Sequence, residues 1–569
     1  MSAHNHGSSF STRTAHIAPP RHTTFSEGLH HTEARQATFV ATQLTEIIVT
    51  LRLSRRRFLT TAAAGTFTTA SGIALPYVSR AADRPMVSHG VQSGDVNTDS
   101  GVVWARADRP SQLMVEVATT ESFKDARALP PITALPENDF TAKMLIEDLP
   151  SDQTIFYRAR FRDLSHINIV GDPVVGRFRT APASRRDVTF VWGGDVAGQG
   201  FGINPDDGGM FTFKAMRGHN PDFLLHNGDT IYADGIIPSE VKLPDGKVWK
   251  NVTIPEKAKV AETLDEYRAA HKYNLLDEHL RAFNAEIPIF VQWDDHEVTN
   301  NWSLSKELPA AYKERNVTLL AARAAKAFHE MYPMRESITE PGRIYRTINY
   351  GPLVDVFMLD ERSYRGPNGE NLQAEYGPGA YFIGPDQLAW LKRELARSKA
   401  LWKVIASDMP LSIIVYDDAV AKKGSEAFAQ GDGPARGREL EIADLLRFIK
   451  AAGIRNTVWL TADVHYTAAN YYNPDKAQFQ DFEPFWEFVS GPFHAGSFGP
   501  GAMDNTFGPE VRFVKAPGAD RQNLSPLEGM QFFGHVKIDG KTGELTVTLR
   551  DRKDATTAAL SADCRARRV

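Results

Sequence analysis

Residues 188–195 read VTFVWGGD, an apolar run that passes through two glycines directly into an aspartate. The same arrangement, a short apolar run with an acidic residue just beyond it, recurs five times toward the C-terminus. The other runs are 223–226 before Asp229, 287–293 before Asp294, 353–359 before Asp360, 402–406 before Asp408 and 457–460 before Asp463. Helical patterns lie between them, at 264–283, 317–332, 385–398 and 438–452. Alternating strands and helices predict a layered α/β domain.

The segment before this domain has a different pattern. Residues 86–182 contain short alternating runs such as 101–106, 113–118 and 155–160, separated by turns. Alternation with period two predicts a small antiparallel β-sandwich of the fibronectin-like kind. The α/β domain is then expected over 186–552, and residues 553–569 as a tail. Two strands near its end, 532–538 and 544–550, predict that its sheets are mixed.

Composition excludes several classes of protein. The 569 residues carry a formal net charge of −5, so a nucleic acid is not expected as a stable partner. Cys564 is the one cysteine in the sequence, which excludes an internal disulfide and every zinc site of the CxxC type. A metal site in this chain must therefore use carboxylate, imidazole, phenolate or amide ligands.

The N-terminus contains a pattern typical of export. SRRRFL at residues 54–59 precedes a mildly apolar stretch, 60–78, and the small residues Ala81 and Ala82. This order resembles a twin-arginine signal, although the basic start of an amphipathic helix is the alternative. We expect residues 1–50 to be an unstructured extension and 51–82 the signal. The twin-arginine translocase is then a partner during export, the destination is periplasmic or extracellular, and no permanent membrane span is expected.

The acidic residues after the strands predict a metal site. Loops beyond the carboxyl ends of strands converge on one crevice in an open α/β sheet. Six acidic loops would repel one another there, and a hard cation that takes several oxygen ligands would relieve the repulsion. Each motif alone has a simpler interpretation, because Gly-Asp after a strand is commonly a turn or a helix cap. Their repetition favours the metal site.

Several of these motifs also identify a family. Asp195, GD-x-x-Y at residues 228–232, DHE at 295–297 and D-x-H at 463–465 resemble the calcineurin-like metallophosphoesterases. WDDHE-x-x-NN at 293–301, LD-x-R-x-YR at 359–365 and HG-x-x-SGD at 89–95 are similar to the PhoD-type alkaline phosphatases and phosphodiesterases. The resemblance covers about residues 86–550. It implies a phosphoesterase core that acts on small phosphomonoesters and often phosphodiesters.

The resemblance also implies cofactors and ligands. Two or more metal ions are expected, Fe³⁺ and Ca²⁺ by resemblance, with Zn²⁺ or Mn²⁺ as alternatives. Some members of the family place a cysteine ligand after the first core strand, where this chain has Asp195. We expect Asp229 to bridge two metals. The remaining expected ligands are Asp195, Tyr232 and His465 on one metal, Asn300 and Asp463 on its neighbour, and Asp295 as a further ligand.

A metal-bound hydroxide is the expected nucleophile, as in other two-metal sites. His296 is expected to bind the phosphate or to protonate the leaving group. Arg362 is expected to contact two phosphoryl oxygens, the alternative being an ion pair with Asp360. Two rival functions remain open: a phospholipase D on the same scaffold, and an exported, non-catalytic binding protein that uses the sandwich for adhesion.

Overall fold

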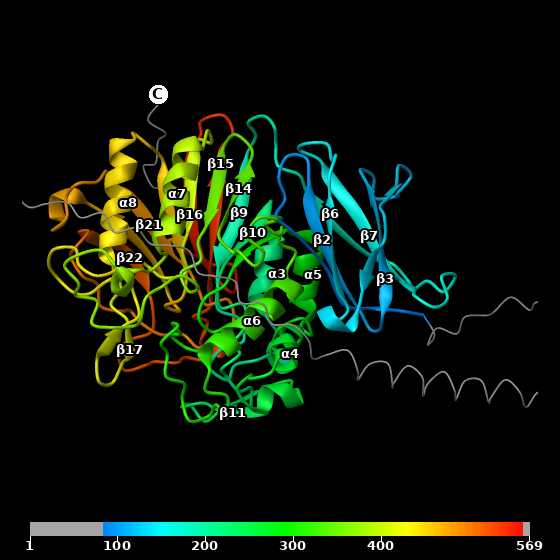
Figure 1. The fold of residues 1–569 in the computed structure, drawn as a ribbon, viewed down its shortest axis with the longest axis horizontal. Helices are drawn as coiled ribbons and strands as arrows, with labels where there is room; N and C mark the ends of the chain where they lie inside the picture. Colours follow the sequence, from blue (N-terminus) through cyan, green and yellow to red (C-terminus); the bar gives the residue numbers. More distant parts are fainter. Residues whose placement is uncertain (1–83, 561–569) are drawn as a thin grey trace, which may run out of the picture. The chain divides into compact units, whose positions relative to one another are not determined.

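A computed structural model describes residues 84–560 of the chain, so the predicted extension and signal lie outside the described residues. The α/β core has two sheets that pack face to face, with helices on both outer faces (Figure 1). The strand-end motifs therefore come from two sheets, whereas the sequence argument assumed a single open one.

The first sheet has nine strands in the order β25-β24-β23-β9-β10-β13-β1-β2-β6. Its central strands β9, β10 and β13 are parallel, and β23 runs antiparallel beside β9. The bounds are β1 Val87–Gly94, β2 Gly101–Ala107, β6 Thr141–Ile146, β9 Val188–Gly193, β10 Phe223–Asn227, β13 Ile289–Gln292, β23 Phe532–Ile538, β24 Leu545–Asp551 and β25 Thr556–Leu560. The sheet is mixed as predicted, and β25 extends it into residues that were expected to be a tail.

The second sheet has seven strands in the order β14-β15-β16-β19-β21-β20-β22. Strands β15, β16, β19 and β21 are parallel, and the other three strands pair antiparallel with their neighbours. The bounds are β14 Arg346–Tyr350, β15 Val354–Met358, β16 Trp402–Ala406, β19 Thr457–Thr461, β20 Thr467–Tyr472, β21 Phe485–Val489 and β22 Pro509–Lys515. Three of the six predicted motif strands, β15, β16 and β19, belong to this sheet.

Buried side chains fill the space between the two sheets. Phe190 and Trp192 of β9 belong to the same apolar cluster as Val356 of β15 and Leu460 of β19. The outer face of the first sheet packs on α3 (Phe211–Gly218), α4 (Leu264–Asn274), α5 (Glu278–Glu286) and α6 (Val317–Met331). The outer face of the second sheet packs on α7 (Pro385–Arg397) and α8 (Glu439–Ala451). Both sheets are thus buried on two faces, which explains their continuous apolar runs.

One predicted helix is two helices. The pattern at 264–283 predicted a single helix, but α4 ends at Asn274 and α5 begins at Glu278. The side chain of Asp277 accepts a hydrogen bond from the backbone N–H of Leu280 and caps α5. An aspartate in this position starts a new helix because it satisfies an amide that has no partner within the helix.

The N-terminal strands form two layers, as the alternation predicted. The outer layer contains β3 (Ser111–Ala118), β4 (Arg127–Ala128), β5 (Ile132–Ala134), β7 (Thr154–Asp163) and β8 (Val174–Arg179). The other layer is β1-β2-β6, which is continuous with the core sheet because Gly94 of β1 pairs in parallel with Ile289 of β13. The boundary between this region and the core stays a prediction.

Two hairpins lie outside the main sheets: β11 (Glu240–Lys242) with β12 (Val248–Lys250), and β17 (Tyr416–Asp418) with β18 (Lys423–Ser425). Within residues 84–560, the helices are all too short or too polar to span a bilayer.

Candidate metal centre

The loops that follow the parallel strands of both sheets bring buried acidic and histidine side chains together. Asp195 follows β9 and Asp229 follows β10, whereas Asp463 and His465 follow β19 of the second sheet. All four residues have a left-handed backbone, with φ between 50° and 69°. Such angles are uncommon for residues other than glycine and concentrate at functional sites. The strand ends thus position these side chains in strained loops.

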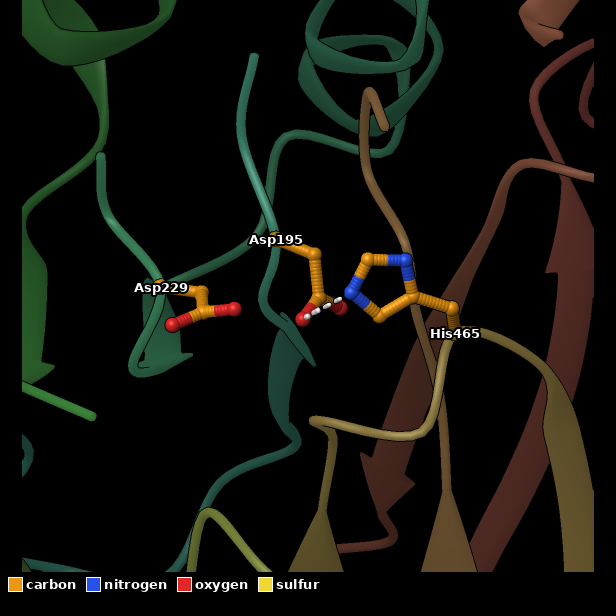
Figure 2. Close-up of side chains that lie close together, drawn as sticks. All are labelled: Asp195, Asp229 and His465. Atoms are coloured by element: carbon orange, nitrogen blue, oxygen red, sulfur yellow. Dashed lines mark ion pairs between the residues drawn. The ribbon is translucent and has the colours of Figure 1, made fainter. Parts of the chain in front are cut away.

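The first cluster contains Asp195, Asp229 and His465 (Figure 2). One ligand atom from each residue lies within 4.8 Å of the others, and Nε2 of His465 is 3.4 Å from Oδ1 of Asp195. Gly491 leaves room for this carboxylate, because a Cβ atom at residue 491 would lie 2.2 Å from Oδ2 of Asp195. The arrangement brings two carboxylates and an imidazole to a common point.

His465 is held in the tautomer that a metal ligand requires. Its Nδ1 donates to the carbonyl oxygen of Gly496, which leaves Nε2 as the basic nitrogen. Nε2 is 2.7 Å from the hydroxyl of Tyr232, so the tyrosine reaches the same point as the cluster. Burial lowers the pKa of His465 to about 4, which keeps the imidazole neutral. Ligating histidines commonly donate their second N–H to a carbonyl oxygen in this way.

A second cluster contains Asp229, Asp295 and His296 and shares Asp229 with the first. The Nδ1 of His296 contacts both carboxylate oxygens of Asp234, at 2.8 and 2.9 Å. Burial opposes the imidazolium, but the carboxylates of Asp234 and Asp295 outweigh it and raise the pKa of His296 to about 10. The Nε2 of His296 lies 4.0 Å from Oδ1 of Asp295, and the side chain is 15% exposed, so an imidazolium here can donate a hydrogen bond to an anion such as a phosphate.

The third cluster contains Asp294, Asp295 and Asp463. Arg362 lies against it: the guanidinium contacts Asp294, and its Nη2 is 4.0 Å from Oδ1 of Asp463. The expectation that Arg362 contacts the phosphate is not supported by this geometry, because its side chain has no exposed surface. The alternative ion pair with Asp360 is also wrong, since the contact of Arg362 with Asp360 is made by its backbone N–H and not by its guanidinium.

Arg362 instead neutralises buried carboxylates. Its Nε is 3.4 Å from Oδ2 of Asp408, and its Nη1 contacts Glu426. Those carboxylates and Asp294 are fully buried. The Arg362 side chain is fully buried, so it does not reach a substrate and acts on the site through its neighbours.

The carboxylates of the three clusters need a positive partner. Burial and the neighbouring carboxylates raise the pKa values of Asp195, Asp229 and Asp463 well above the ordinary aspartate range. Among the described residues, three of these carboxylate oxygens lack a hydrogen-bond partner: both oxygens of Asp195 and Oδ1 of Asp295. Buried carboxylate oxygens without partners are costly unless a cation binds them. The residues present therefore fit a site for hard divalent or trivalent cations.

Most of the predicted ligands meet at this site, and the role of Asn300 stays a prediction. Asn300 is exposed, and its backbone N–H donates to Oδ2 of Asp234 at 2.7 Å. Sequence reasoning missed Asp234, which orients His296, although it stands two residues after Tyr232 in the GD-x-x-Y motif. It also missed the role of Glu297, whose carboxylate accepts the backbone N–H groups of Thr230 and Asp294 and joins the second and third strand-end loops.

Comparisons with known proteins agree with the motifs. A family model described as PhoD-like phosphatase matches residues 190–549, more than half of the chain. The chain belongs to the PhoD-like phosphatase family. A second model, for the N-terminal domain of PhoD-like phosphatases, matches residues 71–182. The resemblance predicted from the motifs is thereby confirmed.

Two relatives of this PhoD-like chain show how far the likeness extends. Alkaline phosphatase D of Bacillus subtilis (strain 168) is 28% identical over 408 residues, which are 68% of this chain and 65% of that protein. The chain thus matches just under two thirds of the length of that curated relative. A solved structure of PhoD superposes with a TM-score of 0.60 at 21% identity, covering 83% of this chain and 92% of that one. That superposition establishes the fold.

Proposed function

We propose that this chain hydrolyses phosphoric esters with the help of cations held by the three acidic clusters. The observation that carries the proposal is the group of buried, unpartnered carboxylate oxygens at the strand ends of a PhoD-like fold. Asp195, Tyr232 and His465 would hold one cation, Asp229 would be shared, and Asp295 and Asp463 would hold a neighbour. By resemblance these cations are Fe³⁺ and Ca²⁺, although the donors also suit Mn²⁺ or Zn²⁺. When bound, they supply charge neutralisation for the phosphoryl group and activation of water.

His296 is the side chain that would move a proton. Its Nδ1 is held by Asp234, so only Nε2 faces the centre. A histidine oriented in this way can hydrogen-bond a phosphoryl oxygen or donate a proton to the departing alkoxide. The carboxylate of Asp234 stabilises the imidazolium that this donation requires.

The substrate class is tested by comparing three esters with the purified, metal-loaded chain. We expect hydrolysis of a soluble monoester such as 4-nitrophenyl phosphate and slower hydrolysis of its bis(4-nitrophenyl) diester. Release of a headgroup from phosphatidylcholine vesicles with no monoester hydrolysis would favour the phospholipase D alternative. Failure to hydrolyse any of the three would contradict the proposal.

Replacement of Asp234 tests the proton-transfer role of His296. Asp234→Asn should lower kcat on the order of tenfold to a hundredfold, since partners of this kind typically contribute that much. The metal content should stay close to that of the parent, because Asp234 belongs to none of the three clusters. The check is kcat together with metal content. Unchanged kcat at full metal content would show that His296 needs no orientation by Asp234.

Export is part of the same proposal and concerns residues outside the described range. Replacing Arg55 and Arg56 together by lysine should leave the precursor in the cytoplasm, because the translocase reads the arginine pair. Fractionation and immunoblotting of the parent and the double variant would measure the share of precursor left in the cytoplasm. Normal export of the double variant would contradict the twin-arginine assignment.

A further inference from the structure

A buried charge network connects the third acidic cluster, through Arg362, with the β17–β18 hairpin. Arg362 contacts Asp294 with one part of its guanidinium and Glu426 with Nη1. Glu426 is 1% exposed and directly follows β18 of the β17–β18 hairpin. Glu426 therefore contacts Arg362 through Nη1, whereas Nη2 is the nitrogen that approaches Asp294 and Asp463 of the cluster.

Glu426 is held by two further buried arginines. Its Oε1 accepts from Nη1 of Arg365 at 2.9 Å, and its carbonyl oxygen accepts from Nη1 of Arg438 at 2.8 Å. Arg365 and Arg438 also lie over the ring of Phe382, at 4.5 and 5.3 Å from its centre. Despite burial, Arg362 and Arg365 hold the pKa of Glu426 below its ordinary value, so the residue is an anion. The network fixes the position of Glu426 tightly.

The hairpin contacts the acidic centre at a second point. Asn301 donates from its side chain to the carbonyl oxygen of Tyr416 in β17 at 3.4 Å, and its backbone N–H donates to Asp295. Lys306, in the loop that follows, pairs with Asp417 of the hairpin. A groove of about 620 Å³ lies between this loop and the hairpin. The hairpin is thus joined to the third cluster through Glu426 and through Asn301.

A guanidinium beside carboxylates competes with cations for the same oxygens. The carboxylate of Glu426 holds Nη1 of Arg362 in an ion pair outside the cluster. The Nη2 of Arg362 lies 4.0 Å from Oδ1 of Asp463, too far for a hydrogen bond. If that anion were lost, Arg362 would be expected to pair more fully with Asp294 and Asp463. Cations would then bind less tightly, and the base of the hairpin would lose its charged contact.

We propose that Glu426 is a positioning residue that acts through Arg362, keeping Asp463 available to a cation and linking cation occupancy to the order of the hairpin. This inference rests on the proposed function in one respect, the presence of cations in the acidic clusters. It does not depend on which phosphate ester is hydrolysed.

The test uses the full-length, metal-loaded chain and its Glu426→Gln variant, which keeps the size of the side chain and removes its charge. Metal loss into EDTA, followed by inductively coupled plasma mass spectrometry, should be about tenfold to a hundredfold faster in the variant. Amide hydrogen exchange of residues 416–425 should also be faster. In the parent, EDTA should produce the same increase in exchange.

A matched control separates this effect from the loss of any buried carboxylate. Glu441 is fully buried in α8 and accepts the backbone N–H groups of Phe382, Ile383 and Gly384 without contacting Arg362. Glu441→Gln should lower Tm and leave metal release unchanged. Equal acceleration in both glutamine variants would contradict the positioning role.

A double-mutant cycle tests whether Glu426 acts through Arg362. In an Arg362→Met background, Glu426→Gln should change metal release much less than in the parent. An undiminished effect would mean that Glu426 acts by its charge alone and would overturn the proposal. If a glutamine or methionine variant does not fold, Glu426→Asp replaces it in the test. Because aspartate keeps the negative charge, metal release should stay slow and hydrogen exchange of the hairpin should stay close to that of the parent.

The outcomes distinguish this inference from the proposed function. If the chain binds metals but hydrolyses no ester, the proposed function is wrong, and the role of Glu426 is still tested by the rate of metal release. Normal hydrolysis with unchanged release and exchange in Glu426→Gln would reject the network and leave the function standing. A parent chain without metals would contradict both.

Discussion

Asp229→Asn should abolish nearly all phosphate ester hydrolysis, with a loss on the order of a thousandfold or more, equivalent to about 4 kcal/mol of barrier. Asp229 is fully buried and is the residue that the first two acidic clusters share. An amide provides one ligand oxygen and no negative charge, so the metal content should fall as well. The measurements are kcat/KM and metal content of the purified variant.

The fold should survive this change, because asparagine tolerates the left-handed backbone of residue 229, where φ is 50°. Asp139→Asn is a matched control, since Asp139 also has a positive φ of 49° and a buried carboxylate but pairs with Arg106 far from the clusters. The control should keep its metals and its turnover. Full metal content and normal turnover in Asp229→Asn would show that the residue serves only the turn.

The second large effect concerns stability. Arg362→Met should destabilise the chain by about 3–5 kcal/mol, as expected when one partner of a buried ionic network is removed. The substitution leaves Asp294 and Asp408 without the guanidinium that contacts them. The inhibition constant of inorganic phosphate should stay unchanged, because the buried side chain does not reach substrate. Urea unfolding and phosphate inhibition are the two measurements.

Arg343→Met is a suitable control for that experiment. Arg343 pairs with Glu340, and the two side chains are 24% and 55% exposed, so the loss should be below about 1 kcal/mol. If Arg362→Met instead kept its stability and weakened phosphate inhibition, the guanidinium would be a phosphate ligand, as the sequence motif first suggested.

The strand-end acids could be predicted because the signal is local. An apolar run followed by a carboxylate, as in 188–195, predicts both a buried strand and a polar loop, and the structure places Asp195, Asp229 and Asp463 in acidic clusters that are linked through shared residues. The division of the strands between two sheets could not be predicted in the same way. Which strands pair depends on packing between distant segments, and the local pattern does not contain it.

The environment of Arg362 shows the same limit. Its motif marked it as important, but its partners Asp294 and Glu426 are 68 and 64 residues away in the sequence. Glu426 stands in a loop with no periodic pattern or motif around it, so nothing in the sequence indicated it. Asp234 is different, because its place beside Tyr232 was a usable signal.

The most direct test of the central claim is to measure metal content and ester hydrolysis together while a chelator removes the metals. The purified full-length chain is titrated with EDTA, and bound metal and turnover of 4-nitrophenyl phosphate are followed in the same samples. The acidic clusters predict at least two metal ions per chain, and turnover should fall as they leave and return when they are restored. Undiminished turnover in a metal-free chain would contradict the account.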